Sequence, residues 1–278
     1  MTLSKFYIDD IIKTALLEDI NYIDLASDCL IPEEQMGEAY FVAKDSGVLC
    51  GIEIAMRVFE LLSDKITYKV YINDGQDVKK GDIIAEMKGD MVSLLKGERT
   101  ALNILQHLSG ISTATNLCVK AVEGTKARIV ETRKTLPGLR PMQKYAVTMG
   151  GGKNHRYNLS DAAMIKDNHI DACGSLEEAV RILREKLSHM NRIEVEVRDL
   201  DELKRALKTS ADVIMLDNMS PEMMKEAVKI ADGKVILEAS GNITLSNIKE
   251  VAQTGVDVIS LGALTHSVKA FDISMKIK

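Results

Sequence analysis

The feature that most restricts the fold of this chain is an alternation of strand and helix in its second half. Helix signals occur between the later strands: Ser175 with Glu178 forms a capping box, and Ser220 precedes Pro221 at a helix start. The later strands begin roughly 20 residues apart, enough for a helical crossover between parallel strands. The pattern therefore predicts a parallel α/β sheet or barrel. The predicted strands cover 127–132, 162–166, 193–197, 213–216, 235–238 and 258–261.

Polar residues stand at or just beyond the carboxyl ends of five of these strands. They are Lys166, Glu196, Asp217, Glu238 with Ser240, and Ser260. The carboxyl ends of barrel strands are where active sites are built. Any single residue of this kind is commonly a loop residue or a helix cap, but their recurrence at the same end of successive units favours a site. Six strands, rather than the eight of a complete barrel, are legible.

The first half follows a different pattern. Residues 1 to about 30 read as helix, and 38–95 read as short strands and turns of an antiparallel sheet. The segment around Lys80-Gly81-Asp82 is similar to the turn-and-strand pattern of lipoyl or biotinyl carrier domains. A carrier needs a modifiable lysine at a hairpin tip, and Lys88, the nearest candidate, follows that turn too soon. A purely structural sheet is the favoured interpretation.

Positive charge is concentrated between residues 131 and 169. Only Glu131, Asp161 and Asp167 oppose the cations there, while the whole chain has a formal net charge of −5. Mutual repulsion makes such a cluster costly unless an anion neutralises it, so we expect a pocket for small anions such as carboxylates or phosphates. The cations are Arg133, Lys134, Arg140, Lys144, Lys153, Arg156 and Lys166.

Small residues and acids complete the predicted site. Ser240-Gly241-Asn242 and Ser260-Leu261-Gly262 follow the last two strands, where small residues let backbone N–H groups approach a phosphate. Glu196 and Asp217 offer carboxylates for ribose hydroxyls, for a developing cation, or for Mg²⁺ held partly by substrate phosphates. The alternative for each acid is an ion pair with Lys166 or Arg156.

Composition excludes several classes of protein. A mildly acidic chain lacks the basic surface that general nucleic-acid binding needs, and no apolar run reaches the ~18 residues of a membrane span. The N-terminus has no signal-peptide pattern. None of the four cysteines is in C-x-x-C spacing, which favours reduced thiols in a cytoplasmic protein over a zinc site or disulfides.

A series of motifs resembles the quinolinate phosphoribosyltransferase family. The motifs occur in family order across nearly the whole chain, and their combination is highly specific although no single one is. They are E-R-T-A-L-N at 98–103, S-G-I at 109–111, E-T-R-K-T at 131–135, P-G-L-R at 137–140, K-Y-A-V at 144–147, G-G-G-x-N-H-R at 150–156, I-K-D-N-H at 165–169, E-V-E-V at 194–197, L-D-N at 216–218, E-A-S-G-N at 238–242 and G-A-L-T-H-S at 262–267.

The resemblance implies a fold, a reaction and an assembly. The expected fold is an N-terminal α/β sandwich domain over 1–105, to which 265–278 returns, and an incomplete parallel α/β barrel over 106–264. The implied reaction joins quinolinate to phosphoribosyl pyrophosphate and gives nicotinate mononucleotide, pyrophosphate and carbon dioxide. It requires Mg²⁺ and is a step of NAD biosynthesis. The implied assembly is a homodimer.

The resemblance also assigns roles to residues that match the motifs. Glu196 and Asp217 fall where the family contacts ribose and metal, and Lys134 and Lys166 join them as expected catalytic groups. Arg99 is expected to reach the active site of the neighbouring subunit. The expected quinolinate-binding residues are Arg133, Lys134, His155, Arg156 and Lys166, and Thr132 is a further expected substrate-binding residue. The 5′-phosphate loops are expected at Ser240, Gly241 and Asn242 and at Ser260, Leu261 and Gly262.

Two other enzymes remain alternatives at this point. A pyrophosphorylase associated with molybdenum transport resembles the same family, although the intact Lys166-Asp167-Asn168-His169 and Asn154-His155-Arg156 favour the quinolinate enzyme. A Schiff-base barrel aldolase would use Lys166, whose cationic neighbours would lower the pKa of its amine. The surrounding anion-binding residues favour a substrate clamp.

Overall fold

The computed structural model describes residues 3–278, which form two compact units. The first contains residues up to 116 together with 136–151 and 265–278, and the second contains 117–135 and 152–264. Met1 and Thr2, the start of the predicted N-terminal helix, lie outside the described residues. The predicted fold class, a mixed α/β unit followed by a parallel α/β unit, is confirmed. The domain limits of 105 and 264 stay a prediction.

The first unit is built on a four-stranded antiparallel sheet in the order β12-β1-β5-β3. The C-terminal strand pairs with β1, so the last residues belong to this unit. The same part of the chain also forms a two-stranded antiparallel sheet, in which β2 (Gly47–Val48) pairs with β4 (Asp77–Val78). The four strands are β1 (Met36–Ala43), β3 (Thr67–Val70), β5 (Ile83–Asp90) and β12 (Ile273–Ile277).

The position of Lys88 contradicts the carrier-domain alternative. Lys88 is inside β5, where it is paired with Glu38 of β1 on one side and with Thr67 of β3 on the other. Its Nζ forms an ion pair with Glu38 Oε1 at 3.0 Å. A lysine in the middle of a central strand is not at a hairpin tip, so a carrier role is wrong.

Helices of the first unit depart from the sequence prediction. The N-terminal region is two helices, because the chain turns at 20–26, where Asp24 Oδ1 accepts the N–H groups of Ala26 and Ser27. The stretch from 38 to 95, expected to be strands and turns, contains a further helix, α3. The helices are α1 (Lys5–Asp19), α2 (Ser27–Leu30), α3 (Ile52–Leu62), α4 (Met91–Ala121), α5 (Arg140–Met149) and α11 (Ala263–His266), of which α4 and α11 continue across the limits of the unit.

The helix α4 has 31 residues and runs through the expected domain limit at 105. The buried face of α4 carries hydroxyl side chains, so the periodicity of apolar residues alone does not show the full extent of this helix. Ser112 Oγ donates to Val48 O at 2.6 Å, and Ser109 Oγ accepts the N–H of Cys50 at 3.0 Å. These bonds satisfy backbone groups of the β2 region that would otherwise be buried without partners.

The second unit is a six-stranded parallel sheet in the order β6-β11-β10-β9-β8-β7. Strands β7 to β11 lie in chain order, and β6 pairs with β11, as in a barrel. Edge strands β6 and β7 are not hydrogen-bonded to each other, so the barrel is incomplete, as predicted. The strands are β6 (Arg128–Val130), β7 (Ala163–Ile165), β8 (Ile193–Val197), β9 (Val213–Asp217), β10 (Ile236–Ser240) and β11 (Val258–Ser260).

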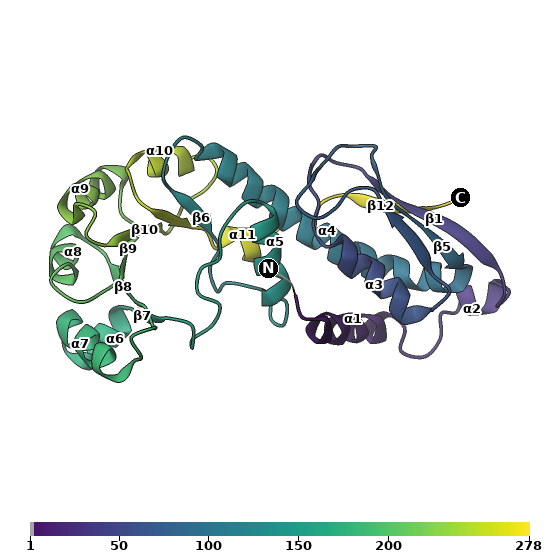
Figure 1. Cartoon of the computed structure of the whole chain (residues 1–278), viewed down its shortest axis with the longest axis horizontal. Coiled ribbons are helices and arrows are strands. Elements are labelled where there is room, and N and C mark those ends of the chain that lie inside the picture. The colour runs from purple at the N-terminus through teal and green to yellow at the C-terminus, as the bar shows by residue number, and fades with distance from the viewer. Residues whose placement is uncertain (1–2) are drawn as a thin grey trace. The chain divides into compact units, whose positions relative to one another are not determined.

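Helices follow the strands and line the outer side of the curved sheet (Figure 1). The predicted caps are confirmed: Ser175 Oγ accepts the N–H of Glu178, and Ser220 Oγ accepts that of Met223. All six predicted strands are present. The helices are α6 (Asp167–Cys173), α7 (Leu176–Lys186), α8 (Leu200–Ala206), α9 (Pro221–Ala231) and α10 (Ile248–Gln253). Among residues 3–278, no helix is both long and apolar enough to cross a bilayer.

Candidate active site

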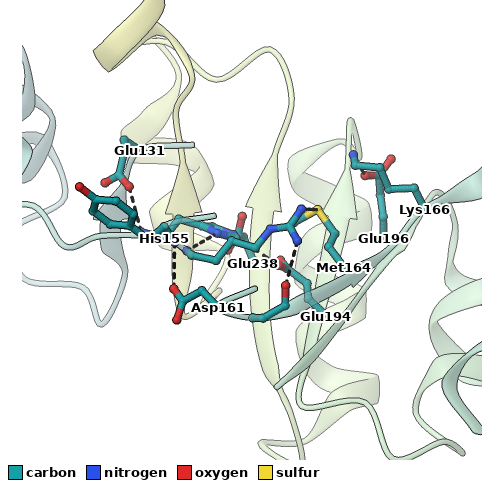
Figure 2. A network of polar contacts seen from close by, with 11 residues as sticks. Glu131, His155, Asp161, Met164, Lys166, Glu194, Glu196 and Glu238 are labelled. Atoms are coloured by element: carbon teal, nitrogen blue, oxygen red, sulfur yellow. Dashed lines mark hydrogen bonds and ion pairs between the residues drawn. The ribbon is translucent and has the colours of Figure 1, made fainter. Parts of the chain in front are cut away.

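The carboxyl edge of the six-stranded sheet gathers the polar residues that the strand pattern predicted. Because side chains alternate between the faces of a strand, Glu194 and Glu196 of β8 share one face. Lys166 directly follows β7, and its Nζ forms an ion pair with Glu196 Oε2 at 2.5 Å (Figure 2). This is the ion pair that was the alternative for Glu196. The lysine side chain is 47% exposed and the glutamate side chain 17%, so the pair faces outward and a substrate can reach it.

The ends of β9 and β10 are tied together by asparagines. Asp217 and Ser240 are register partners, and the N–H of Asn218 donates to Ser240 O at 2.9 Å. Asn218 Nδ2 donates to Asp217 Oδ2 at 3.0 Å, and Asn242 Nδ2 donates to Asn218 Oδ1 at 2.9 Å. Asn218 and Asn242 both have positive φ, 54° and 51°. The predicted phosphate loop is therefore held in one conformation against the carboxylate of Asp217.

Gly241 is required in this loop for two reasons. Its φ is +91°, and a Cβ there would lie 2.3 Å from Asn218 Oδ1. That oxygen cannot move away freely, because it accepts a hydrogen bond from Asn242 and belongs to the amide held by Asp217.

We therefore expect Gly241→Ala to destabilise the protein more than Gly233→Ala does. Gly233 has a similar φ of +71° with nothing within 4 Å of its Cβ position, so its variant reports backbone strain alone, about 1–2 kcal/mol. Loss of the Asn242–Asn218 bond should add about 1 kcal/mol at Gly241. Chemical denaturation measures both. Equal losses of stability in the two variants would show that the asparagine contact contributes nothing.

A loop after α5 brings His155 and Arg156 to the open side of β6. Lys153 forms an isolated parallel bridge with Val130, and its N–H donates to Ile129 O at 2.8 Å. Two residues later the N–H of His155 donates to Glu131 Oε1 at 3.2 Å. The loop thus runs along the edge that β7 leaves unpaired and turns His155 toward β8 and β10.

Two buried carboxylates hold the ring of His155. Its Nε2 lies 3.3 Å from Glu194 Oε2 and 3.3 Å from Glu238 Oε2, and the side chains of the two glutamates are 6% and 4% exposed (Figure 2). Burial alone would lower the pKa of His155, but the two carboxylates outweigh burial and raise this pKa to about 10. Burial also raises the pKa of Glu194. The two carboxylates therefore favour a proton on Nε2 of His155, which faces both of them.

The backbone of Arg156 indicates where that proton lies. The N–H of Arg156 donates to His155 Nδ1 at 2.7 Å, which needs a lone pair on Nδ1 and is incompatible with a second ring proton there. We therefore assign a ring proton to Nε2, where it faces Glu194 Oε2 and Glu238 Oε2.

The guanidinium of Arg156 lies near that of Arg133. Arg156 Nη1 donates to Ala162 O at 2.9 Å. Burial lowers the pKa of Arg156, and the charge of Arg133 lowers it further. Arg133 Nε is buried without a hydrogen-bond partner. Two neighbouring guanidinium groups with a buried unsatisfied donor fit an anion, because Arg presents a planar fork to carboxylate or phosphate.

The remaining predicted residues have different environments. Thr132 Oγ1 accepts the N–H of Lys134 at 3.1 Å, and the Lys134 side chain is exposed. Ser260 Oγ is buried without a partner. The N–H of Leu261 donates to Val130 O at 2.9 Å, so it holds the sheet. Of the two predicted phosphate loops, the one at 240–242 is the better defined by side-chain contacts.

Three cationic residues that the sequence analysis connected with the site lie in the first unit. Arg99 is exposed on α4, and Arg140 and Lys144 are on α5. The second unit therefore holds five of the seven clustered cations: Arg133, Lys134, Lys153, Arg156 and Lys166.

Sequence reasoning missed three functional candidates: Glu131, Glu194 and Asn218. Glu238 was counted among the polar residues at the strand ends but was given no chemical role. For Glu194 a signal existed, since it is two residues from Glu196 on one strand.

The predicted metal pair consists of two carboxylates, Glu196 and Asp217. Glu196 lies near the carboxyl end of β8 and Asp217 is the last residue of the neighbouring strand β9, and both side chains are partly exposed. Mg²⁺ usually binds through one or two protein carboxylates, with water and phosphate oxygens completing its shell. The pair therefore fits Mg²⁺ that is held together with a diphosphate substrate.

Two models of one protein family match nearly the whole chain. Residues 24–109 match the family model for the N-terminal domain of quinolinate phosphoribosyl transferase, and residues 111–276 match the model for its C-terminal domain. A probable nicotinate-nucleotide pyrophosphorylase [carboxylating] of Methanocaldococcus jannaschii is 45% identical, covering 98% of each chain. The protein of the same name from Bacillus subtilis is 44% identical, over 94% of this chain and 90% of its own.

Solved structures share the fold. The structure of NadC from Streptococcus pyogenes is 40% identical with a TM-score of 0.97, covering 100% of this chain and 99% of that one. The nicotinate-nucleotide pyrophosphorylase from Francisella tularensis is 40% identical with a TM-score of 0.94, covering 100% of this chain and 98% of that one.

Proposed function

Because the chain belongs to the quinolinate phosphoribosyltransferase family, we propose that the carboxyl edge of its six-stranded sheet is the active site. The enzyme is a nicotinate-nucleotide pyrophosphorylase (carboxylating). It transfers phosphoribosyl from phosphoribosyl pyrophosphate to quinolinate with decarboxylation, in NAD biosynthesis. The observation that carries the proposed location is the convergence of the Lys166–Glu196 pair, the Asp217–Asn218–Asn242 contacts and the His155–Arg156 loop on this edge.

Quinolinate, a pyridine with two neighbouring carboxylates, binds at the cationic side of the edge. Arg133 and Arg156 offer guanidinium groups, and Arg133 Nε is a buried donor that needs an acceptor. Lys166 is exposed and contributes a point charge beside Glu196. The full proposed set is Thr132, Arg133, Lys134, His155, Arg156 and Lys166. Its role is to hold the ring nitrogen in line with the ribose carbon that it attacks.

The ribosyl donor binds on the adjacent strand ends. The loop Ser240-Gly241-Asn242 receives the 5′-phosphate, with Ser260, Leu261 and Gly262 beside it. Glu196 and Asp217 accept hydrogen bonds from the ribose hydroxyls and also hold Mg²⁺, which, when bound, neutralises charge on the leaving diphosphate. Because diphosphate departure leaves oxocarbenium character on the ribose, these carboxylates also stabilise the positive charge that develops.

Decarboxylation follows from the product of the first step. The pyridine nitrogen uses its lone pair to form the bond to ribose, and pyrophosphate leaves with the electron pair of the broken bond. Nitrogen then carries a positive charge. When the adjacent carboxylate leaves as carbon dioxide, this charge stabilises the carbanion, which takes a proton to give nicotinate mononucleotide. Positioning and charge stabilisation therefore account for the roles of Lys134, Lys166, Glu196 and Asp217.

We also propose a homodimer in which Arg99 serves the active site of the neighbouring subunit. Arg99 is an exposed cation on α4, available for an anionic group outside its own unit. A cytoplasmic location fits the four free cysteines, of which Cys29 and Cys173 are exposed.

The geometry does not support the aldolase alternative. A Schiff base needs a neutral lysine amine, whereas Lys166 is paired with a carboxylate at 2.5 Å. The molybdenum-associated pyrophosphorylase is disfavoured by the relatives, which are named for nicotinate-nucleotide synthesis.

The direct test is product stoichiometry. Purified protein with quinolinate, phosphoribosyl pyrophosphate and Mg²⁺ should release carbon dioxide and pyrophosphate in equal amounts. EDTA should abolish turnover, and excess Mg²⁺ should restore it. Asp217→Asn should require more Mg²⁺ for half-maximal rate, because it removes a charged oxygen ligand, whereas the exposed-surface variant Asp201→Asn should not. Pyrophosphate release without carbon dioxide would contradict the proposed reaction, and full turnover in EDTA would contradict the metal requirement.

A further inference from the structure

The buried carboxylates below the active-site edge belong to a network that ends on Arg156. Glu194 and Glu238 come from different strands, β8 and β10, and both approach the same ring nitrogen of His155. The other ring nitrogen accepts the N–H of Arg156, whose guanidinium reaches back to Ala162 O and to Met164 Sδ at 3.7 Å (Figure 2). The network therefore determines the ring plane of His155 and the direction in which Arg156 leaves the backbone.

These carboxylates are unsuited to bind substrate themselves. Both are nearly fully buried, and Glu194 Oε1 and Glu238 Oε1 lack a hydrogen-bond partner. A carboxylate against a dicarboxylate substrate would repel it. Burying two acids with unsatisfied oxygens is costly, so their presence requires a compensating role.

A bound metal ion is the other role that three such groups suggest. The ligand atoms of His155, Glu194 and Glu238 all lie within 4.8 Å of one another. A metal on Nε2 would move the ring proton to Nδ1, where it would oppose the N–H of Arg156 at 2.7 Å. The hydrogen bond at Nδ1 thus favours a proton, not a metal, between Nε2 and the carboxylates.

We propose that Glu194 and Glu238 are positioning residues that hold the His155–Arg156 segment for quinolinate without touching it. The inference rests on the proposed function and adds to it. Both ring nitrogens of His155 are engaged within the protein, so His155 contributes to the proposed quinolinate-binding set through Arg156, whose guanidinium supplies the charge that meets the substrate at this point. Glu194 and Glu196, two residues apart on one strand, then serve different substrates: Glu194 serves quinolinate through His155, and Glu196 serves the ribosyl donor directly.

The test compares Glu194→Gln, Glu238→Gln and Glu196→Gln, with Glu185→Gln on the exposed side of α7 as the surface control. Loss of a residue that orients a metal ligand typically costs about 10- to 100-fold in affinity, and we take the same range for residues that orient a substrate-binding side chain. We expect Glu194→Gln and Glu238→Gln to raise the KM and Kd for quinolinate by that factor, with the KM for phosphoribosyl pyrophosphate changed by less than about twofold. Glu196→Gln should show the opposite selectivity. Calorimetry with quinolinate alone measures the Kd, and circular dichroism verifies folding.

A second measurement does not depend on variants. In wild-type protein with ¹⁵N-labelled histidine, the Nε2 resonance of His155 should stay in its hydrogen-bonded state when quinolinate is added, since its partners remain the two glutamates. A large shift on binding would overturn the proposal, as would equal effects of the Glu194 and Glu196 variants on both substrates, or a stoichiometric metal lost in Glu238→Gln. Failure of the wild type to bind quinolinate would instead refute the proposed function.

Discussion

A mixture of Arg99→Ala and Arg133→Ala chains is expected to recover about a quarter of wild-type activity, although each variant alone is nearly inactive. Each variant lacks one charge-assisted contact to an anionic substrate, worth about 1.5–3 kcal/mol, so each should lose about ten- to a hundredfold in rate. Arg133 lies three residues beyond the end of β6 in the second unit, and Arg99 is on α4 in the first. Recovery follows only if one site takes the two arginines from different subunits.

The expected fraction follows from symmetry. Random exchange of equal amounts makes about half of the dimers heterodimeric, and each heterodimer has one site with both arginines and one with neither. About a quarter of all sites are then intact. The control is Lys120→Ala, which removes a cation from the exposed end of the same helix and should leave activity unchanged.

The contrary outcome is equally clear. Activity no greater than the sum of the two variants, after subunit exchange has been verified with differently tagged chains, would show that Arg99 does not complete its neighbour's site. A fully active Arg99→Ala protein would remove Arg99 from the site altogether.

Much of the second unit was predictable because parallel strands leave a simple record. Each buried strand is a short apolar run, and the residue where the run stops lies at the carboxyl edge. Lys166, Asp217 and Ser240 were located by this rule, and the structure places them at that edge. The six legible runs left a complete barrel unestablished, and the resemblance to the family, not the pattern, predicted that the barrel is incomplete.

The helices of the first unit were harder to predict. In α3 the polar residues Glu53, Arg57 and Glu60 are spaced at helical intervals opposite a buried apolar face, so a helical signal existed that the prediction of strands and turns for 38–95 overlooked. In α4 the reverse holds, because hydroxyls such as those of Ser109 and Ser112 occupy the buried face and bond to the backbone of another segment. In α4, tertiary contacts that no local pattern records therefore decide which face is buried.

The His155 cluster shows the same limit at the site. Sequence comparison of motifs suggested His155 as a substrate ligand, but it gave no role to Glu194 or Glu238. Those two acids are 44 positions apart in the chain and meet only because β8 and β10 curve around the same loop. Alternation along β8 places Glu194 on the same face as Glu196. The partner of Glu194, His155, could not be predicted in this way, because it depends on the course of the loop at 152–156.

Rejection of nicotinate is the other large effect that we expect. Nicotinate lacks the carboxylate next to the ring nitrogen, so the group that faces Arg133 or Arg156 would be missing and a buried donor would stay unsatisfied. Sites built to bind a polar substrate group reject analogues without it by about 10⁴-fold or more. A guanidinium left without its anion adds an uncompensated charge to that loss.

The measurement that tests the central claim most directly is therefore kcat/KM for quinolinate and for nicotinate, each with phosphoribosyl pyrophosphate and Mg²⁺, followed by pyrophosphate release. An active site formed by the cations at the carboxyl edge predicts a preference for quinolinate of about 10⁴-fold, and Arg156→Ala should reduce that preference by lowering the rate with quinolinate most. Comparable kcat/KM values for the two acids in the wild-type enzyme, or an Arg156→Ala variant with unchanged preference, would contradict it.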